Sequence, residues 1–203
     1  PKGCLMTDAS TGAMTPATSS VLLVLAHPAL ERSRANRALA KAAKGYAGVT
    51  FKDLYETYPD FVIDIEAEQA ALRAHQVVAL QFPLYWYSTP ALLKEWLDLV
   101  WLHGFAYGEG GEALKGKKLF VACTTGASAK AYHAHGYNRF SMDEFLRPLE
   151  QTAHLCGMDW ETPFVVHGAS VKDDAALKAE AERYRARIAS LLPAAPVAGK
   201  TEA

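Results

Sequence analysis

Cysteine is scarce in this sequence and does not occur in closely spaced pairs. The 203 residues include three cysteines, Cys4, Cys123 and Cys156, and no C-x-x-C motif. This usage excludes a disulfide framework and favours a reducing cytoplasm as the compartment. Cys123 belongs to an apolar run and is expected to be a small buried core residue.

Excess charge and long hydrophobic runs are also missing. The 21 Lys and Arg residues nearly balance the 22 Asp and Glu residues, for a net charge of −1 at pH 7. The balance leaves no overall basic excess that would suggest nucleic-acid binding. No apolar run approaches the roughly 20 residues of a membrane-spanning helix, and residues 21–26 are too few for the core of a secretory signal. The composition is that of an ordinary globular domain.

Glycine-rich phosphate motifs are absent. Neither G-x-G-x-x-G nor G-x-x-x-x-G-K-[ST] occurs, so the chain has no dinucleotide fingerprint and no P-loop. The segment Gly108-Glu109-Gly110-Gly111 has the wrong spacing and no preceding strand, and we interpret it as a turn. No nucleophile elbow and no paired-carboxylate arrangement appear either.

What the chain does contain is an alternation of apolar strands with helical patterns. Strands are predicted at 21–26, 49–54, 76–80, 117–123 and 159–166, and helices at about 33–45, 64–74, 90–101, 142–156 and 173–192. This order predicts an α/β fold: a doubly wound, five-stranded parallel sheet with helices on both faces. We expect one domain over 21–192, between a mobile leader at 1–20 and a mobile tail at 193–203.

Three consecutive aromatic residues, Tyr85, Trp86 and Tyr87, follow the third predicted strand. Thr89 and Pro90 are predicted as the N-cap and first position of the next helix. In an open α/β sheet, ligands bind at the carboxyl ends of the strands. The aromatic residues can hold a flat ligand there, or they can cover a core edge or a dimer contact.

A second candidate site follows the first strand, where His27 precedes a helix opened by Ser33. The amides and dipole of a helix start favour an anion such as phosphate. The Ser33 hydroxyl, the Asn36 amide and the guanidinium of Arg34 or Arg32 can add donors. The alternative is that Ser33 acts as an N-cap and nothing more.

A third candidate is the segment Thr124-Thr125-Gly126-Ala127-Ser128 at the end of the fourth strand. Glycine permits close backbone approach, and successive amides can bond a planar heterocycle. An ordinary turn is the alternative.

The fourth candidate is the segment Tyr132-His133-Ala134-His135-Gly136-Tyr137. His-x-His is half of a metal site, but no Cys, Asp or Glu pattern completes one, so no metal is expected. A tyrosine and a histidine near a ligand can instead stabilise developing negative charge. A solvated loop remains the alternative.

Together these motifs resemble the NAD(P)H:quinone oxidoreductase family, flavodoxin-like enzymes that include DT-diaphorase. The resemblance covers about 21–191 and rests on the following motifs: His27-Pro28, Ser33-x-x-Asn36, Gln81-Phe82-Pro83-Leu84-x-Trp86-Tyr87-x-x-Pro90, Leu93-Lys94-x-Trp96, Phe105-Ala106-Tyr107 and Thr124-Thr125-Gly126. Shorter bacterial members, which include the ancillary flavoprotein of the glutathione-regulated potassium efflux system, are more similar still. They share Leu54-Tyr55-x-x-Tyr58-Pro59-Asp60-Phe61-x-Ile63-Asp64 and Ala67-Glu68-Gln69-x-Ala71-Leu72.

The resemblance implies a flavodoxin-like fold and a flavin cofactor, FMN by similarity to the short members, with FAD as the alternative. The implied cofactor-binding residues are His27, Ser33, Arg34 and Asn36 at the phosphate, Pro83, Leu84, Tyr85, Trp86 and Tyr87 at the ring, and Thr124, Thr125, Gly126 and Ala127 at its far edge. The catalytic candidates are Tyr132, in the position of the family's active-site tyrosine, and His135.

Three positions depart from the family pattern. Tyr85 replaces a glutamine and Ala127 replaces a second glycine. The histidine that accompanies the active-site tyrosine in the animal enzymes falls opposite Asn138, so His135 stands near that position but out of register.

The resemblance implies a homodimeric enzyme that transfers hydride from NAD(P)H through flavin to a quinone by a ping-pong cycle. The apolar helix at 90–101 and the connection at 55–64 also favour a dimer, because they carry more apolar surface than one protomer is expected to cover. The alternative is a regulatory subunit that binds the cytoplasmic domain of a potassium efflux protein. Through that partner the subunit would be peripheral at the inner face of the membrane. A one-electron flavodoxin carrier fits less well, because the net charge is near neutral.

Overall fold

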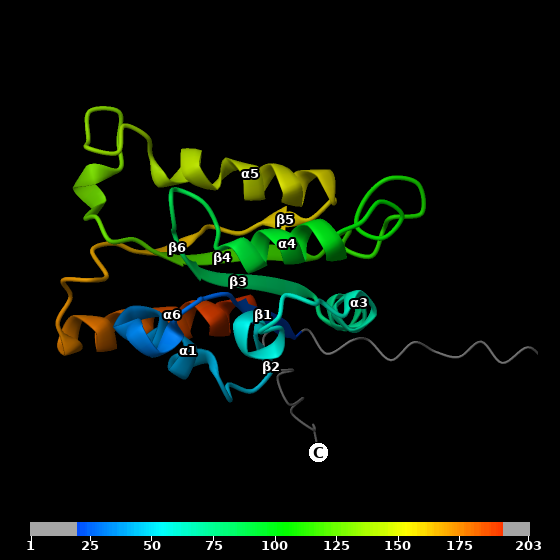
Figure 1. The fold of residues 1–203 in the computed structure, drawn as a ribbon, viewed down its shortest axis with the longest axis horizontal. Coiled ribbons are helices and arrows are strands. Elements are labelled where there is room, and N and C mark those ends of the chain that lie inside the picture. Colours follow the sequence, from blue (N-terminus) through cyan, green and yellow to red (C-terminus); the bar gives the residue numbers. More distant parts are fainter. Residues whose placement is uncertain (1–19, 193–203) are drawn as a thin grey trace, which may run out of the picture.

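The structure is a computed structural model, and it describes residues 20–192 (Figure 1). The predicted leader, except for Ser20, and the predicted tail lie outside the described residues. The strands are β1 (Val21–Leu25), β2 (Val49–Asp53), β3 (Val77–Pro83), β4 (Lys118–Thr124), β5 (Asp159–Trp160) and β6 (Phe164–Val166). The helices are η1 (Leu30–Arg32), α1 (Arg34–Ala43), α2 (Leu54–Thr57), α3 (Ile65–Ala74), α4 (Ala91–Val100), η2 (Ala129–Ala131), α5 (Met142–Leu155) and α6 (Asp174–Leu191).

All strands run parallel in the order β2-β1-β3-β4-β5, and β6 also pairs with β4. This is the doubly wound, flavodoxin-like order, so the predicted fold class is confirmed. Parallel strands place all their carboxyl ends at one edge of the sheet, on the left in Figure 1.

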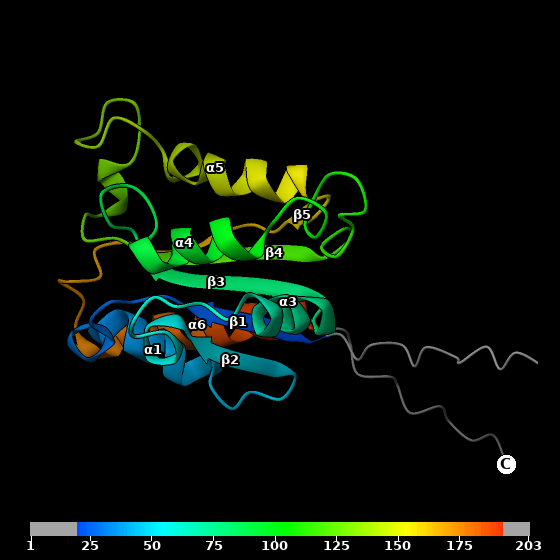
Figure 2. The same cartoon turned by 45° about the vertical axis from the view of Figure 1, so that its right-hand side comes forward.

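Two apolar cores lie on opposite faces of the sheet, because successive side chains of a strand alternate between its faces. In β1, Leu22 and Val24 join the core under α3, α4 and α5, whereas Leu23 joins the core under α1 and α6. Figures 1 and 2 show α4 and α5 above the sheet and α1 and α6 below it. The prediction of helices on both faces is confirmed.

The fifth predicted strand, 159–166, is divided in the structure. Asp159–Trp160 pairs with Lys118 and Leu119, and Phe164–Val166 pairs with residues 122–124. Pro163 lies in the interruption, and its missing amide hydrogen cannot contribute to a ladder. The sheet therefore has six strands in five positions, and the prediction of one continuous fifth strand was wrong.

Two predicted helix starts are confirmed and one was wrong. Ser33 and Asp64 cap α1 and α3, since their side chains accept hydrogen bonds from the amides of Asn36 and Ala67. Thr89 does not cap α4. Pro90 holds the N-cap position in an extended conformation with ψ 152°, so the helix begins one residue later, at Ala91.

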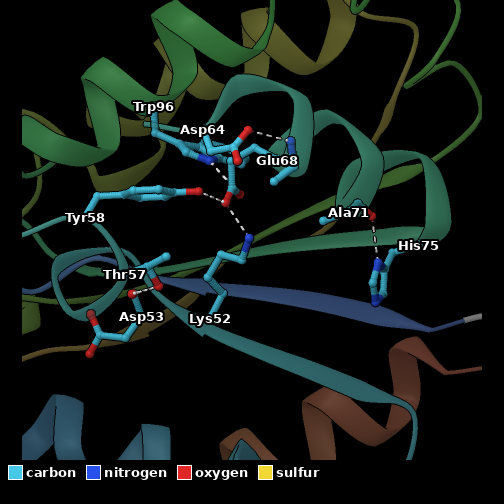
Figure 3. A network of polar contacts seen from close by, with 10 residues as sticks. Lys52, Asp53, Thr57, Tyr58, Asp64, Glu68, Ala71, His75 and Trp96 are labelled. Atoms are coloured by element: carbon cyan, nitrogen blue, oxygen red, sulfur yellow. Dashed lines mark hydrogen bonds and ion pairs between the residues drawn. The ribbon is translucent and has the colours of Figure 1, made fainter. Parts of the chain in front are cut away.

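A buried carboxylate ties three elements together beneath α4 (Figure 3). Glu68 of α3 is fully buried and accepts hydrogen bonds at Oε1 from the Lys52 ammonium and the Tyr58 hydroxyl, the latter at 2.5 Å. Its Oε2 accepts one at 3.0 Å from the Trp96 indole of α4. A buried charge is tolerated when it is paired and fully hydrogen-bonded, and Glu68 meets both conditions.

Candidate functional site

The loops at the carboxyl edge of the sheet line two adjoining cavities. The larger has a volume of about 470 Å³ and is lined by His27, Ala29, Arg32, Ser33, Arg34, Ala35, Asn36, Pro83, Leu84, Tyr85, Thr124, Thr125, Gly126, Ala169 and Ser170. The smaller, about 220 Å³, is lined by Leu84, Trp86, Tyr87, Ala127, Tyr132 and Asn138. Leu84 belongs to both. Every predicted cofactor-binding residue therefore lines at least one of these two adjoining cavities.

The N-terminus of α1 forms the polar end of the larger cavity. The Ser33 hydroxyl accepts a hydrogen bond from the Asn36 amide at 3.1 Å. The amides of Arg34 and Ala35 belong to the first turn, where a helix supplies no acceptor, and the helix dipole adds positive potential. These groups suit an anion such as a phosphate.

Asn36 connects this helix start to the end of β4. Its Nδ2 donates to Ser33 Oγ at 3.2 Å and to Thr124 Oγ1 at 2.9 Å, and its carbonyl accepts from Gln81 Nε2 at 3.1 Å. Its own Oδ1 is buried without a hydrogen-bond partner among the described residues. Buried acceptors are normally satisfied, so the polar network beside the cavity is incomplete in the protein alone.

His27 adds a neutral donor at the same end. Its Nδ1 accepts a hydrogen bond from the Ala29 amide at 3.1 Å, which places the hydrogen of the neutral ring on Nε2. Burial lowers the pKa of His27 below 6.5, although the nearby Glu31 opposes the shift. The ring is therefore neutral at pH 7, with one N–H to donate.

The guanidinium of Arg34 is turned toward α6. It donates to Asp174 Oδ1 at 2.6 Å and to the Lys172 carbonyl at 2.9 Å, although the residue lines the larger cavity. Arg32 contacts Glu31 at 3.7 Å and is highly exposed. In this structure the backbone amide of Arg34, rather than its side chain, is the donor available at the helix start.

The aromatic loop closes in a two-residue hairpin turn. The amides and carbonyls of Tyr85 and Ser88 exchange hydrogen bonds of 3.0 and 2.9 Å. Trp86 and Tyr87 therefore take left-handed backbone conformations, with φ of 48° and 63°. Such strain in residues other than glycine is concentrated at functional sites. Tyr87 stacks on Phe145 of α5 at 5.0 Å between ring centroids, while Trp86 is 93% exposed.

Trp86→Gly should raise the free energy of unfolding by roughly 0.5–1 kcal/mol. Glycine removes the left-handed penalty of about 1–2 kcal/mol and adds a smaller entropic cost, while the exposed indole gives up few contacts. Urea denaturation of the protein without ligand measures the change. Trp86→Ala keeps the Cβ and serves as the control, and equal stability of the two variants would contradict the strain.

The turn after β4 is braced by the loop after β6. The Thr125 amide donates to the Val166 carbonyl at 3.0 Å, and the Thr125 and Ala127 carbonyls accept from the amides of Ala169 and Gly168, both at 2.9 Å. A methyl group placed on Gly126 would meet no atom within 4 Å, so the space beside this turn is open.

Tyr132 and His135, the two catalytic candidates, lie in different surroundings. Tyr132 lines the smaller cavity, with its ring centroid 6.0 Å from Phe145 and 5.3 Å from His167. His135 is exposed and lines neither cavity, and its amide donates to His133 Nδ1 at 3.2 Å. Within residues 20–192, no three His, Cys, Asp or Glu side chains are grouped to hold a metal ion.

Sequence reasoning missed the residues after β6. Ala169 and Ser170 line the larger cavity, and His167 contacts Thr125 and Tyr132. A usable signal existed, because the loop after the last parallel strand must reach the same edge as the others.

A family model described as a flavodoxin-like fold matches residues 19–188. The chain belongs to this flavodoxin-like family. Among named relatives, the glutathione-regulated potassium-efflux system ancillary protein KefG of Pectobacterium atrosepticum is 49% identical over 173 residues, which are 85% of this chain and 94% of that protein. The expected resemblance is thereby confirmed.

Solved structures of similar proteins include flavin proteins and quinone reductases. General stress protein 14 of Treponema denticola, in complex with FMN, is 38% identical, with a TM-score of 0.80 over 85% of this chain and 99% of that one. An NADPH-quinone reductase from P. pentosaceus is 32% identical, with a TM-score of 0.76 over 83% and 97% of the two chains.

None of the helices between residues 20 and 192 is both long enough and apolar enough to cross a membrane.

Proposed function

We propose that this protein is a flavin-dependent NAD(P)H:quinone oxidoreductase that binds FMN. The observation that carries the proposal is a pair of adjoining cavities that share Leu84, one at a helix start suited to an anion and the other at the aromatic loop. A flat ring bearing a phosphate matches this combination of donors and aromatic surface. Similarity to an FMN-bound protein and to a quinone reductase supports it.

FMN, when bound, would supply two-electron hydride chemistry, taken from NAD(P)H and passed to a quinone in a ping-pong cycle. The amides of Arg34 and Ala35 and the Nε2–H of His27 would hold the phosphate. Trp86 and Tyr87 would lie along the ring, and the Thr125–Ala127 turn would meet its far edge. A preference for FMN over FAD follows from the short phosphate site and the absence of a dinucleotide fingerprint.

Identifying the cofactor tests this proposal directly. We expect the purified protein to be yellow and to release FMN, without adenine, on denaturation. We also expect it to oxidise NAD(P)H when a quinone is supplied, with parallel lines in double-reciprocal plots, as a ping-pong cycle requires. Protein that stays colourless after incubation with FMN would refute the flavin assignment.

Tyr132→Phe should slow quinone reduction by about tenfold to a hundredfold while flavin remains bound. One hydrogen bond to a charged group contributes about 1.5–3 kcal/mol, and the Tyr132 hydroxyl would act on charge that develops on the ring. Stopped-flow measurement of both half-reactions checks the change. Tyr137→Phe is the control, because Tyr137 lies on the same loop and is 90% exposed. Unchanged rates would leave Tyr132 as a wall of the cavity.

We include a homodimer in this proposal. The surface that supports it in the structure is not the one that the sequence suggested. The apolar face of α4 is covered within the protomer, with Trp96 fully buried, so that helix does not require a partner. A largely apolar cavity of about 380 Å³ instead opens between α4 and α5, and Leu155 on its rim is 59% exposed. A second protomer would cover this surface, and light scattering at micromolar concentration gives the mass.

A second candidate function is that of an ancillary subunit of a potassium efflux system, favoured by the 49% identity to KefG. In this role the protein would be cytoplasmic and peripheral at the inner face of the membrane, through contact with an efflux protein. Co-purification with the efflux protein of the same organism tests it. The two functions are compatible, since the reductase site and a docking surface can coexist on one fold.

A further inference from the structure

His167 occupies a position between two parts of the candidate site. It follows β6, and its Nδ1 lies 3.2 Å from Thr125 Oγ1. Its ring centroid lies 5.3 Å from that of Tyr132, with the ring planes at 43°. The residue is half-buried and lies next to Gly168, whose amide bonds the Ala127 carbonyl. His167 therefore contacts the turn proposed for the flavin's far edge and the proposed catalytic tyrosine together.

The hydrogen bonds of Thr125 determine which ring nitrogen of His167 carries the hydrogen. The Thr125 hydroxyl has one hydrogen, and it donates this to the Ala127 carbonyl at 2.9 Å. Its oxygen must then accept the 3.2 Å bond, so Nδ1 of His167 is the donor. The neutral ring consequently keeps a lone pair at Nε2, the opposite tautomer to that of His27.

Burial keeps His167 neutral before any ligand binds, because it lowers the pKa of the ring. Glu180 of α6 opposes this shift, and Lys172 adds to it. Glu180 is itself paired with Lys172 at 3.1 Å and with Arg183 at 2.8 Å. The other ionisable side chain that faces the ring is Tyr132, 5.3 Å away between ring centroids.

We propose that His167 is a positioning residue of the reductase site. Through Nδ1–H it orients the Thr125–Ala127 turn, and at Nε2 it takes up one proton from solvent when negative charge develops at the flavin edge that this turn would meet. This inference rests on the proposed function. A charge that appears beside a neutral, half-buried imidazole favours the imidazolium, and that proton uptake balances the charge without any bond to the ligand.

The first test uses the protein without flavin. Nitrogen NMR of the imidazoles should show His167 as the Nδ1–H tautomer, with a pKa below 6.5, and Thr125→Val should abolish the tautomer preference by removing the acceptor hydroxyl. An Nε2–H tautomer in the wild type would overturn the proposal, whether or not the protein binds flavin.

The second test measures how the midpoint potential of the FMN-loaded protein varies with pH. We expect the wild type to take up one more proton per two electrons than His167→Asn, in the pH range just above the His167 pKa of the oxidised protein. Asparagine retains a donor at the position of Nδ1 and does not titrate, so it keeps the turn and removes the proton site. His154→Asn, at an exposed position on α5, should match the wild type.

The outcomes separate the two claims. Equal pH dependence in the wild type and in His167→Asn would overturn the role of His167 and leave the reductase proposal standing. Failure of the wild type to bind FMN would overturn the reductase proposal, and the role of His167 with it. If His167→Asn does not fold, His167→Gln gives the same comparison, since glutamine does not titrate either.

Discussion

Glu68→Ala should destabilise the protein by about 3–5 kcal/mol, because it removes the acceptor of three buried or half-buried donors. The Lys52 ammonium, the Tyr58 hydroxyl and the Trp96 indole all depend on this one carboxylate. Burial and the bond to Glu68 also raise the pKa of Tyr58, so its hydroxyl stays a neutral donor that needs an acceptor. Urea denaturation of the protein measures the loss.

Two comparisons separate the network from a general effect of mutating α3. Glu66→Ala, at an exposed position on the same helix, should change stability by no more than about 0.5 kcal/mol. Lys52→Met should be less destabilising in the Glu68→Ala background than in the wild type. In that background there is no buried Glu68 carboxylate that would lose its ion-pair partner. If the effects of Lys52→Met and Glu68→Ala on the free energy of unfolding are additive, the interaction between the two side chains contributes nothing to stability.

Arg34→Pro should lower FMN affinity by roughly tenfold to a hundredfold, because it deletes one backbone donor to the phosphate, a charge-assisted bond of about 1.5–3 kcal/mol. Proline is tolerated at the first position of a helix, where the amide has no acceptor within the helix. Ser33 already has an extended conformation, φ −97° and ψ 104°, as a residue before proline requires. Fluorescence titration of the apoprotein with FMN measures the affinity.

Arg34→Ala is the matched control for this experiment. It removes the same guanidinium and its contact with Asp174 but keeps the amide. We expect its FMN affinity to stay within about threefold of wild type, since an exposed ion pair contributes little. Equal losses in the two variants would assign the effect to the side chain, and no loss in either would place the phosphate elsewhere.

Local patterns predicted most of the elements, and each failure has a local or a tertiary cause. The helix starts at Ser33 and Asp64 were predicted because a cap depends on residues three positions apart in the sequence. Thr89 was misassigned because Pro90 can occupy either the cap or the first turn, and packing of α4 on the sheet decides between them. Pro163 interrupts the last strand, and the apolar run Phe164–Val166 directly after it concealed this.

The site was predicted in outline and completed by the fold. His27, the aromatic loop and the threonine turn were identified because each follows a recognisable strand. The Arg34 guanidinium was expected at the phosphate end, but in the structure it contacts Asp174, 140 residues away in the chain. No local pattern reports a contact over such a separation.

The sequence by itself determined the order of strands and helices, the parallel sheet and the identity of the three loops at its carboxyl edge. Periodicity, caps and strand-terminal loops are properties of contiguous residues, so they can be recognised without the fold. Only the tertiary structure decided which side chains meet. The bond from His167 to Thr125 and the burial of Glu68 under Trp96 arise from strand register and helix packing, which join residues distant in the chain.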